Sequence, residues 1–580
     1  MIDIHAGEKA ARGYDEILGL ARGLLPANVR GTSGPTVLAI ECYPGTHLDE
    51  IREKLIEPLG PALVLFADDY AQSSEQVQTR IKDCITEDRV FGVMSHYTID
   101  QFFDKARVND AQAKIGSADG LVVVYGFGST VLCNPDVLVY SSITRWEAQL
   151  RLRAGAQNWK CQNADEDALR KFKRGYFFEW RMADRLKRAL AKRIDLLLDT
   201  NVAGDPRAVP GIQWQSALAQ VASQPFRLVP YFDASPWGGH WMQERFGLDP
   251  EAPNFGWAFD GVPEENSVAL DFDGIVVEVP AQDVVSSNPV ELMGPKVHAR
   301  FGIDYPIRFD YLDTIGGGTL SLQVHPLTAY IQDRFGMAYT QDESYYILDA
   351  SEDSCVYLGV KAGVDKAELV SDLRHAEEGN FRFPDERYVN RVPVKKHDHV
   401  SIPAGTIHCG GAGTVILEIS ATPYIFTFKL WDWGRVGLDG KPRPIHIGHG
   451  APNIRMDRDT DFVQRRLVDR AGEPHENLSS EPGVRVERTG LDELEFIETR
   501  RWWFSDQATL HTHGSVNQLN LVEGDAAVVE SPEGLFDPLE VHYGETFIVP
   551  ECVGSYRIRN LGDRSREIAF IQAFIRGCEG

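Results

Sequence analysis

The sequence predicts a multidomain protein in which a doubly wound α/β domain is followed by mainly β-sheet domains. Its 580 residues are enough for two to four domains with full-sized cores. Residues 1–215 alternate continuous apolar strands with helical segments, the pattern of a mostly parallel sheet. From Pro225 onward, short alternating strands are separated by glycine, proline and aspartate turns, which is typical of a β-sandwich or barrel.

Four buried-type strands define the first domain. They are expected at residues 36–40, 62–66, 120–125 and 136–140. The first strand runs through a glycine turn into a helical segment, which is the context of a phosphate-binding loop. This order of elements resembles a nucleoside kinase of the uridine-kinase type, which has a P-loop fold.

The phosphate loop itself departs from that family. A working loop needs Gly-x-x-x-x-Gly-Lys-Ser/Thr, because its lysine neutralises the β- and γ-phosphates and its hydroxyl holds magnesium. Here Cys42 stands at the first glycine position, and Leu48 and Asp49 replace the lysine and the hydroxyl residue. We therefore expect a degenerate, non-catalytic kinase-like domain without a cofactor site.

The same domain is expected to contain a long amphipathic helix over residues 163–200, broken at Gly175. Apolar residues recur there at helical spacing, and the opposite face carries Arg174, Arg181, Arg185, Arg188 and Lys192. We interpret these basic residues as a solvated face rather than as a nucleotide lid.

Separated segments of the second predicted domain, residues 216–455, indicate one metal site. Gln323 and His325 lie two positions apart on a predicted strand and therefore point the same way. Glu343 opens another strand, and His408 follows a Pro-Ala-Gly turn. An amide oxygen, two imidazoles and a carboxylate suit a catalytic zinc ion, which keeps one position open for water or substrate. We expect one Zn²⁺ per chain.

The motifs around these ligands resemble a known family. Pro403-x-Gly405-x-x-His408 matches the second metal-binding motif of the cupin β-barrels. With the Gln-x-His-Pro segment and Trp431-Asp432-Trp433-Gly434-Arg435, it resembles the class I mannose-6-phosphate isomerases, over roughly the C-terminal three-fifths of the chain. The resemblance implies a cupin (double-stranded β-helix) fold. It also implies a zinc-dependent aldose–ketose isomerase that converts mannose 6-phosphate to fructose 6-phosphate by proton transfer through an enediol.

The resemblance also assigns roles to residues beyond the metal ligands. It implies that Glu418 transfers the proton and that two basic residues, Lys429 and Arg435, face the substrate as catalytic partners. Ser321 is an implied sugar or phosphate contact.

The phosphate half of the implied site departs from the family pattern. The family has lysine where Asp310 and Gln341 stand, and arginine where Lys429 stands. Arg308 lies two residues before Asp310, on the same strand face, and is a candidate to replace the lost charge. We expect Arg308 and Gln341 to contact the substrate.

Residues 456–580 are predicted to form a third domain, a degenerate cupin barrel. His511 and His513 approximate the first cupin motif, but Gln518 stands in place of the usual glutamate and Tyr556 near the last histidine. We expect no metal in this barrel. A weak accessory metal site at the two histidines is an alternative that the sequence leaves undecided. In the second domain, His397 and His399 are interpreted as structural or exposed.

The composition disfavours several kinds of partner. A formal net charge of −26 argues against nucleic acid and anionic membrane surfaces. The eight cysteines include no Cys-x-x-Cys pair, so neither a zinc ribbon nor a disulfide framework is indicated. No signal-peptide pattern and no stretch of about 18 apolar residues occurs, so the cytoplasm is the expected location. The expected partner is a small sugar or sugar phosphate, and the oligomeric state is left open.

Two other functions stay open. A protein with a non-catalytic kinase-like domain and a cupin domain could bind a sugar or a nucleotide as a sensor, without turnover. The absence of the phosphate-loop lysine, and of the two family lysines at positions 310 and 341, favours this alternative. An isomerase of an unphosphorylated sugar would keep the metal chemistry and need no phosphate anchor.

Overall fold

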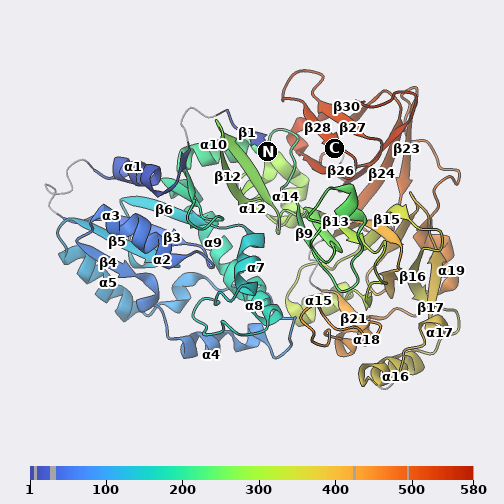
Figure 1. The fold of residues 1–580 in the computed structure, drawn as a ribbon, viewed down its shortest axis with the longest axis horizontal. Coiled ribbons are helices and arrows are strands. Elements are labelled where there is room, and N and C mark those ends of the chain that lie inside the picture. Colours follow the sequence, from blue (N-terminus) through green and yellow to red (C-terminus); the bar gives the residue numbers. More distant parts are fainter. Residues whose placement is uncertain are drawn as a thin grey trace. The chain divides into compact units, whose positions relative to one another are not determined.

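The chain forms a multidomain, largely β-sheet structure, described here from a computed structural model (Figure 1). The described residues are 1–5, 10–26, 34–379, 381–421, 426–490, 492 and 495–578. Two compact units are distinguished: unit 1 contains Met1–Ala222 and Glu264–Asn288, and unit 2 contains Ser223–Pro263 and Pro289–Gly580. Residues 264–288 thus belong to unit 1, although they lie inside the range predicted for the second domain. A boundary near residue 456 stays a prediction.

Unit 1 is built on a seven-stranded sheet with the order β2-β8-β7-β6-β3-β5-β4. Five neighbouring strands are parallel, and β8 and β2 add an antiparallel edge. The strands are β2 (Ala11–Arg12), β3 (Thr36–Cys42), β4 (Leu63–Phe66), β5 (Leu121–Gly126), β6 (Val137–Ser142), β7 (Leu196–Asp199) and β8 (Arg207–Pro210). The four predicted strands are confirmed as β3 to β6, because buried parallel strands carry continuous apolar runs.

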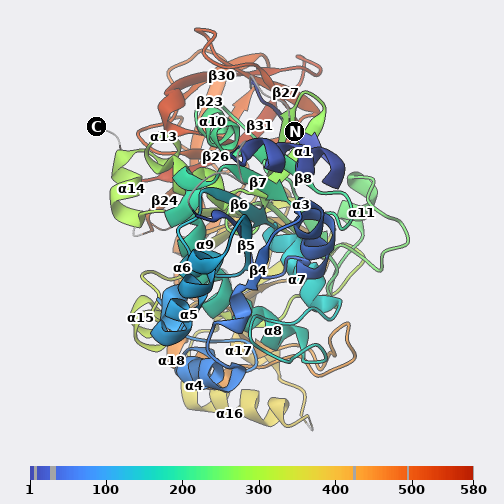
Figure 2. The same ribbon diagram turned by 90° about the vertical axis from the view of Figure 1, so that its left-hand side faces the viewer.

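Helices cover both faces of this sheet (Figure 2). On one face, Leu38 of β3 and Val139 of β6 belong to a core cluster with Ile17 of α1 (Tyr14–Leu24). The next residue of β6, Tyr140, points to the other face. There the ammonium of Lys187, on α9 (Trp180–Leu190), lies 5.3 Å from the Tyr140 ring centroid. The sheet is therefore doubly wound, and its resemblance to a P-loop kinase stays a prediction.

The helix predicted over residues 163–200, with a break at Gly175, is wrong at both ends, although its regular α-helix is interrupted at Gly175. The structure has α8 (Ala168–Arg174), a π-helical turn at Gly175–Glu179, and then α9. The apolar run Leu196–Asp199 joins the sheet as β7. A short apolar run fits a buried strand as well as a helical stripe, so periodicity alone does not separate the two.

Arg174, Arg181 and Arg185 are not solvated, contrary to our interpretation, whereas Arg188 and Lys192 are exposed as expected. Arg174 forms a buried ion pair with Glu179 at 2.9 Å, and Arg181 pairs with Glu264 at 2.5 Å. Arg185 donates to main-chain carbonyls. All three side chains are thus engaged within unit 1.

Residues 264–288 complete unit 1 with a hairpin and a short helix. The hairpin strands β11 (Ser267–Phe272) and β12 (Ile275–Pro280) are followed by α12 (Gln282–Ser287). β1 (Ile2–Asp3) pairs with β11 in parallel. On α12, Asp283 forms a buried ion pair with Lys187 at 2.7 Å.

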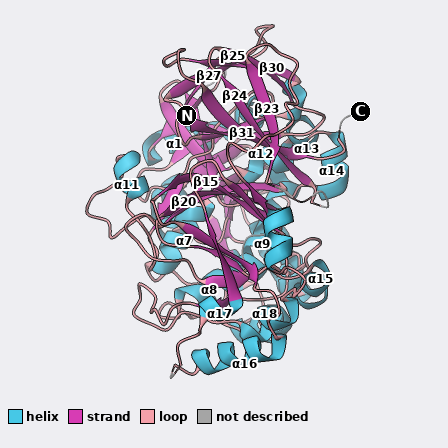
Figure 3. Cartoon of the chain, turned by 90° about the vertical axis from the view of Figure 1, so that its right-hand side faces the viewer, coloured by secondary structure: helices cyan, strands magenta, loops and turns pink. Residues whose placement is uncertain are grey.

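Unit 2 carries two pairs of sheets (Figure 3). In the first pair, a seven-stranded sheet with the order β22-β18-β15-β20-β13-β10-β9 accompanies a five-stranded sheet with the order β17-β16-β19-β14-β21. The strands of the larger sheet are β9 (Tyr231–Asp233), β10 (Trp257–Gly261), β13 (Ile307–Asp313), β15 (Glu343–Ala350), β18 (His399–Ile402), β20 (Thr414–Ala421) and β22 (Val468–Asp469). Those of the smaller sheet are β14 (Leu322–Val324), β16 (Cys355–Val360), β17 (Val389–Pro393), β19 (His408–Gly410) and β21 (Phe428–Trp431).

The second pair of sheets lies in the C-terminal part of unit 2. Its sheets have the orders β23-β24-β31-β26-β29 and β25-β30-β27-β28 and enclose an apolar core. The strands are β23 (Val484–Thr489), β24 (Ile497–Phe504), β25 (Gln507–His511), β26 (Asn517–Glu523), β27 (Ala526–Glu530), β28 (Leu539–His542), β29 (Thr546–Val549), β30 (Ser555–Asn560) and β31 (Ile568–Ile575). None of the helices in the described part of the chain has the length and apolar character needed to cross a membrane.

Candidate functional site

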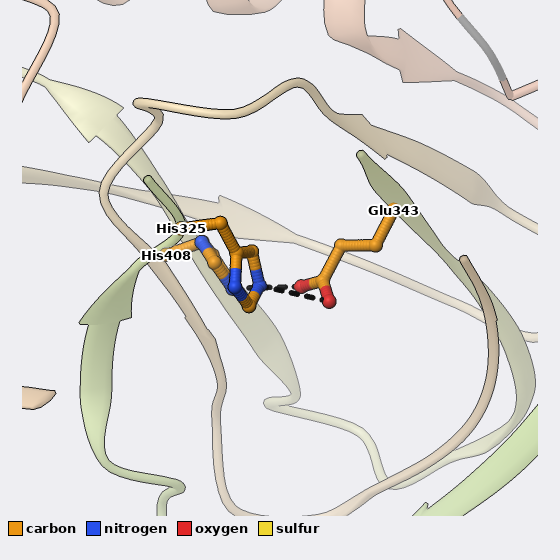
Figure 4. Close-up of side chains that lie close together, drawn as sticks. All are labelled: His325, Glu343 and His408. Atoms are coloured by element: carbon orange, nitrogen blue, oxygen red, sulfur yellow. Dashed lines mark ion pairs between the residues drawn. The ribbon is translucent and has the colours of Figure 1, made fainter. Parts of the chain in front are cut away.

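Three predicted metal ligands converge within unit 2. Nε2 of His325 lies 2.9 Å from Oε2 of Glu343, and Nε2 of His408 lies 2.7 Å from Oε1 of the same carboxylate. One candidate ligand atom from each residue can be chosen so that all three lie within 4.8 Å of one another. Both imidazole rings are directed at the carboxylate, as Figure 4 shows. All three side chains are buried.

Strand register brings the fourth predicted ligand to the same place. Gln323 of β14 is the cross-strand partner of His408, the first residue of β19. Its amide Nε2 lies 3.2 Å from Nε2 of His408, and a 180° rotation of the amide would direct the ligand oxygen there instead. The turn before His408 requires Gly405, whose φ is +88° and whose added Cβ would lie 2.9 Å from the carbonyl oxygen of Asn453.

The donor set fits a divalent ion. Nδ1 of His408 lies 2.9 Å from the carbonyl oxygen of Thr406, and Nδ1 of His325 lies 3.3 Å from that of Phe426. A proton on each Nδ1 satisfies these carbonyls and leaves both Nε2 lone pairs facing Glu343. Among the described residues, Nε2 of His325 and Oε1 of Glu343 have no hydrogen-bond partner. Lone pairs that face a carboxylate repel it unless a cation lies between them, so this donor set could hold a metal ion.

Charge also couples the three residues. Burial alone would raise the pKa of Glu343, but positive charge on His325 and His408 outweighs burial and holds that pKa well below its usual range; a bound cation would take the place of the protons that carry this charge. Glu343 is therefore a carboxylate, which is the form that binds a metal ion.

A second buried group adjoins Glu343. Nε2 of Gln341 lies 3.0 Å from Oε2 of Glu343 and 3.3 Å from Oε1 of Glu418. Nη1 of Arg308 lies 3.3 Å from the same Glu418 oxygen, and its Nη2 lies 2.9 Å from Oδ1 of Asp310. These contacts follow from register, because Asp310 of β13 lies opposite Glu418 of β20. The structure thus brings Glu418, Arg308 and Gln341 together beside the His325-Glu343-His408 cluster.

The guanidinium of Arg308 contacts two carboxylates in this group, those of Asp310 and Glu418. Burial raises the pKa of Glu418 well above its usual range, and the charges of Asp310 and Glu343 add to the rise, whereas Arg308 opposes it. Burial likewise raises the pKa of Asp310 to about 6, again opposed by Arg308.

The other predicted substrate residues form a third group. Nη2 of Arg435 lies 2.5 Å from Oδ1 of Asp432, and Arg443 pairs with the other oxygen of that carboxylate. Nη2 of Arg443 also lies 3.4 Å from Oγ of Ser321. Lys429 of β21 is a cross-strand partner of the metal-site residue Gln323.

Sequence reasoning missed Arg443 and the role of Asp432. In the sequence, Asp432 stands out only as part of the family motif around Trp431. Arg443 lies in a proline-containing loop without strand or helix periodicity, and its partner Ser321 is 122 positions away in the chain. The only available signal was a basic residue soon after the family motif.

His397 and His399 lie outside the metal cluster. His399 is buried between the hydroxyl groups of Ser344, at 2.9 Å, and Thr489, at 3.0 Å. His397 contacts the Tyr346 hydroxyl at 2.8 Å. Both are structural, and neither is exposed.

The interior of the second pair of sheets holds an uncharged hydrogen-bond network. Oδ1 of Asn517 accepts from the Tyr556 hydroxyl at 2.9 Å and from Nε2 of Gln572 at 2.8 Å, and Trp502 donates to Gln572 at 2.8 Å. Of the described residues, only His325, Glu343 and His408 form a group of His, Cys, Asp or Glu side chains able to hold a metal ion. His511 and His513 are not brought into such a group.

Fold and site together define a two-unit chain in which a mainly β unit carries a buried His-Glu-His cluster. This chain is homologous, at modest identity, to mannose-6-phosphate isomerases. The Streptococcus mutans mannose-6-phosphate isomerase is 27% identical over 227 residues, which cover 39% of this chain and 66% of that protein. The Bacillus subtilis enzyme ManA is 24% identical over 345 residues, which cover 59% of this chain and 98% of that protein.

Two further comparisons concern structure and unit 1. The crystal structure of the mannose 6-phosphate isomerase from Bacillus subtilis aligns with a TM-score of 0.47 at 18% identity, covering 60% of this chain and 99% of that one. Residues 13–223 match a sequence family described as a domain of unknown function, DUF8485. The kinase resemblance of unit 1 therefore stays a prediction.

Proposed function

We propose that this protein is a zinc-dependent aldose–ketose isomerase that interconverts mannose 6-phosphate and fructose 6-phosphate in the cytoplasm. The observation that carries the proposal is the convergence of His325, Glu343 and His408 beside the buried carboxylate of Glu418. Homology to mannose-6-phosphate isomerases supports the isomerase class.

The chemistry sets three requirements. Moving a carbonyl from C1 to C2 requires removal of a proton from the carbon beside it, stabilisation of the enediolate oxygens, and return of the proton to the neighbouring carbon. Zn²⁺ held by Gln323, His325, Glu343 and His408 would supply a Lewis acid for the substrate oxygens. The remaining requirements fall to side chains of the chain itself.

Glu418 is our candidate for the proton transfer. In this proposal its carboxylate takes the proton from one carbon and returns it to the next, so one group acts first as base and then as acid. Gln341 and Arg308 each contact Oε1 of Glu418 at 3.3 Å and fix its orientation.

The third group is our candidate phosphate site. Asp432 is shared by Arg435 and Arg443, so the three side chains carry one positive charge in excess. A substrate phosphate would accept from both guanidinium groups and from the Ser321 hydroxyl. Arg443 thus supplies a positive charge for the phosphate, although the family lysines are absent at residues 310 and 341.

A second candidate is an isomerase of an unphosphorylated sugar. It is favoured by the acidic and neutral side chains of Asp310 and Gln341, where the resembling family has lysines. The pair Arg435 and Arg443 disfavours it, because a neutral sugar offers no charge for the excess cation.

The test is metal analysis coupled to a screen of aldoses and their 6-phosphates. We expect about one zinc per chain and turnover of mannose 6-phosphate. His408→Ala should lose the metal, whereas His375→Ala, at an exposed histidine of the same unit, should keep it. Full zinc stoichiometry in His408→Ala would refute the ligand assignment, and sugar binding without turnover would favour a sensing protein.

A further inference from the structure

Unit 1 contains a cavity of about 370 Å³ at the carboxyl ends of its parallel strands. Cys42 at the end of β3, Asp68 beyond β4 and Phe127 beyond β5 line it. In the sheet, β3 lies between β5 and β6, so the chain builds strands first on one side of β3 and then on the other. Open α/β sheets bind ligands at such a switch point, and the volume suits a small molecule.

The wall of the cavity formed by residues 156–162 is held in place from within unit 1. Nε1 of Trp159 donates to Oδ1 of Asp68 at 2.9 Å, and Nζ of Lys160 donates to the Asp68 carbonyl at 2.7 Å. The Trp159 and Phe127 rings meet edge to face, with centroids 5.4 Å apart. Lys160 has φ of +52°, a conformation that a non-glycine residue adopts only where its surroundings enforce it. The wall is therefore pre-formed.

The basic side chains near the cavity already have hydrogen-bond partners within unit 1. Lys160, the one lysine or arginine among its lining residues in the described chain, is bonded to Asp68. Arg151 donates from Nη1 to the Gly45 carbonyl at 2.9 Å and from Nε to Glu147 at 2.7 Å. A chain of phosphates needs several cations or a metal ion to balance its charge. The site thus disfavours a nucleotide.

The remaining polar and apolar groups of the lining suit a neutral ligand with hydroxyl groups. No described residue donates to Oδ2 of Asp68, so one carboxylate oxygen is free to accept. Trp159 and Phe127, both buried in the wall, supply the apolar part of the lining. We propose that this cavity binds a neutral, hydroxyl-bearing ring, either a free sugar or a nucleoside, with Asp68 as the hydrogen-bond acceptor. This proposal is independent of the isomerase assignment.

The test is calorimetric titration of the full-length protein with mannose, fructose, uridine and adenosine, and separately with ATP and Mg²⁺. Asp68→Asn removes the charge and keeps the shape, and should weaken binding about tenfold or more. Ala156→Trp places a large ring in the cavity wall and should abolish binding. Asp69→Asn changes the exposed neighbouring carboxylate and should leave affinity unchanged. Thermal unfolding verifies that each variant is folded.

The outcomes distinguish a sugar ligand from a nucleoside ligand, and binding in this cavity from binding in unit 2. Saturable binding of a hexose identifies a sugar site, and binding of uridine or adenosine identifies a nucleoside site, provided that Asp68→Asn and Ala156→Trp both weaken it. A sugar bound at the metal cluster of unit 2 would be insensitive to both substitutions, and that result would overturn the proposal. It would also be overturned if no neutral probe binds at millimolar concentration, or if ATP with Mg²⁺ binds more tightly than every neutral probe.

Discussion

Arg308 and Glu418 form a buried ion pair, with Nη1 of the arginine 3.3 Å from Oε1 of the carboxylate. The other guanidinium nitrogen, Nη2, is bonded to Asp310 at 2.9 Å. The two carboxylates would repel one another without the shared cation. Arg308 thus holds Glu418 beside the His325-Glu343-His408 cluster, and under the proposed function Glu418 is the residue to test first.

We expect Glu418→Gln to bind zinc normally and to lose turnover about 100-fold or more, because a positioned acid–base group contributes about that much. The amide keeps the size of the side chain and an oxygen for Arg308, so the fold should be preserved. Steady-state kinetics and metal analysis measure the two effects. Glu378→Gln, at an exposed glutamate, is the control and should match wild type. A near-wild-type rate for Glu418→Gln would move the proton transfer to another group.

Arg443→Met tests the candidate phosphate site. We expect KM for mannose 6-phosphate to rise about tenfold or more, because a charge-assisted hydrogen bond to the phosphate is lost. Binding of unphosphorylated mannose should change little. Arg465→Met, at an exposed arginine, is the matched control. An equal effect on both sugars would show that Arg443 stabilises the fold rather than binding phosphate.

Period-two alternation predicts that Gln323 and His325 lie on one strand face, whereas the convergence of His325 with Glu343 and His408 was predictable only through the family motifs around them. The sequence could not predict Arg443, since a loop contact between positions 122 apart leaves no periodic signal. Nor could it predict that residues 264–288 belong to unit 1. Alternation identifies a hairpin such as β11 and β12, but it does not specify the surface against which the hairpin packs.

That placement of residues 264–288 predicts how fragments behave. A fragment ending at Ala222 would lack β11, β12 and α12, whose buried side chains include Val268 and Val279. It would also remove Asp283, the ion-pair partner of Lys187, together with the helix that carries it. We expect this fragment to be unstable, and a fragment with residues 264–288 attached through a flexible linker to unfold cooperatively. Circular dichroism melting compares them, and equal midpoints would contradict the assignment to unit 1.

The buried His399 predicts acid lability. Burial, with Arg501 acting in the same direction, lowers its pKa to about 3 in the folded protein, whereas an unfolded histidine has a pKa of about 6.5. Because the folded pKa is the lower one, the unfolded state binds the proton first as the pH falls. The stability is therefore present above about pH 6.5 and is lost as the pH falls toward 3.

His399→Gln isolates this contribution, because glutamine can bond to the same hydroxyl groups and does not titrate. Between pH 7 and pH 5, wild type should lose about 2 kcal/mol more free energy of unfolding than the variant. Urea unfolding at the two pH values measures the difference. Equal losses in the two proteins would show that His399 is not buried in its neutral form.

The most direct test of the central claim is proton NMR of mannose 6-phosphate incubated in D₂O with the full-length protein. We predict conversion to fructose 6-phosphate with deuterium incorporated at the carbon that exchanges its proton, stopped by a chelator and restored by Zn²⁺. Absence of both conversion and deuterium incorporation, in a protein shown to hold one zinc per chain, would contradict the proposed function.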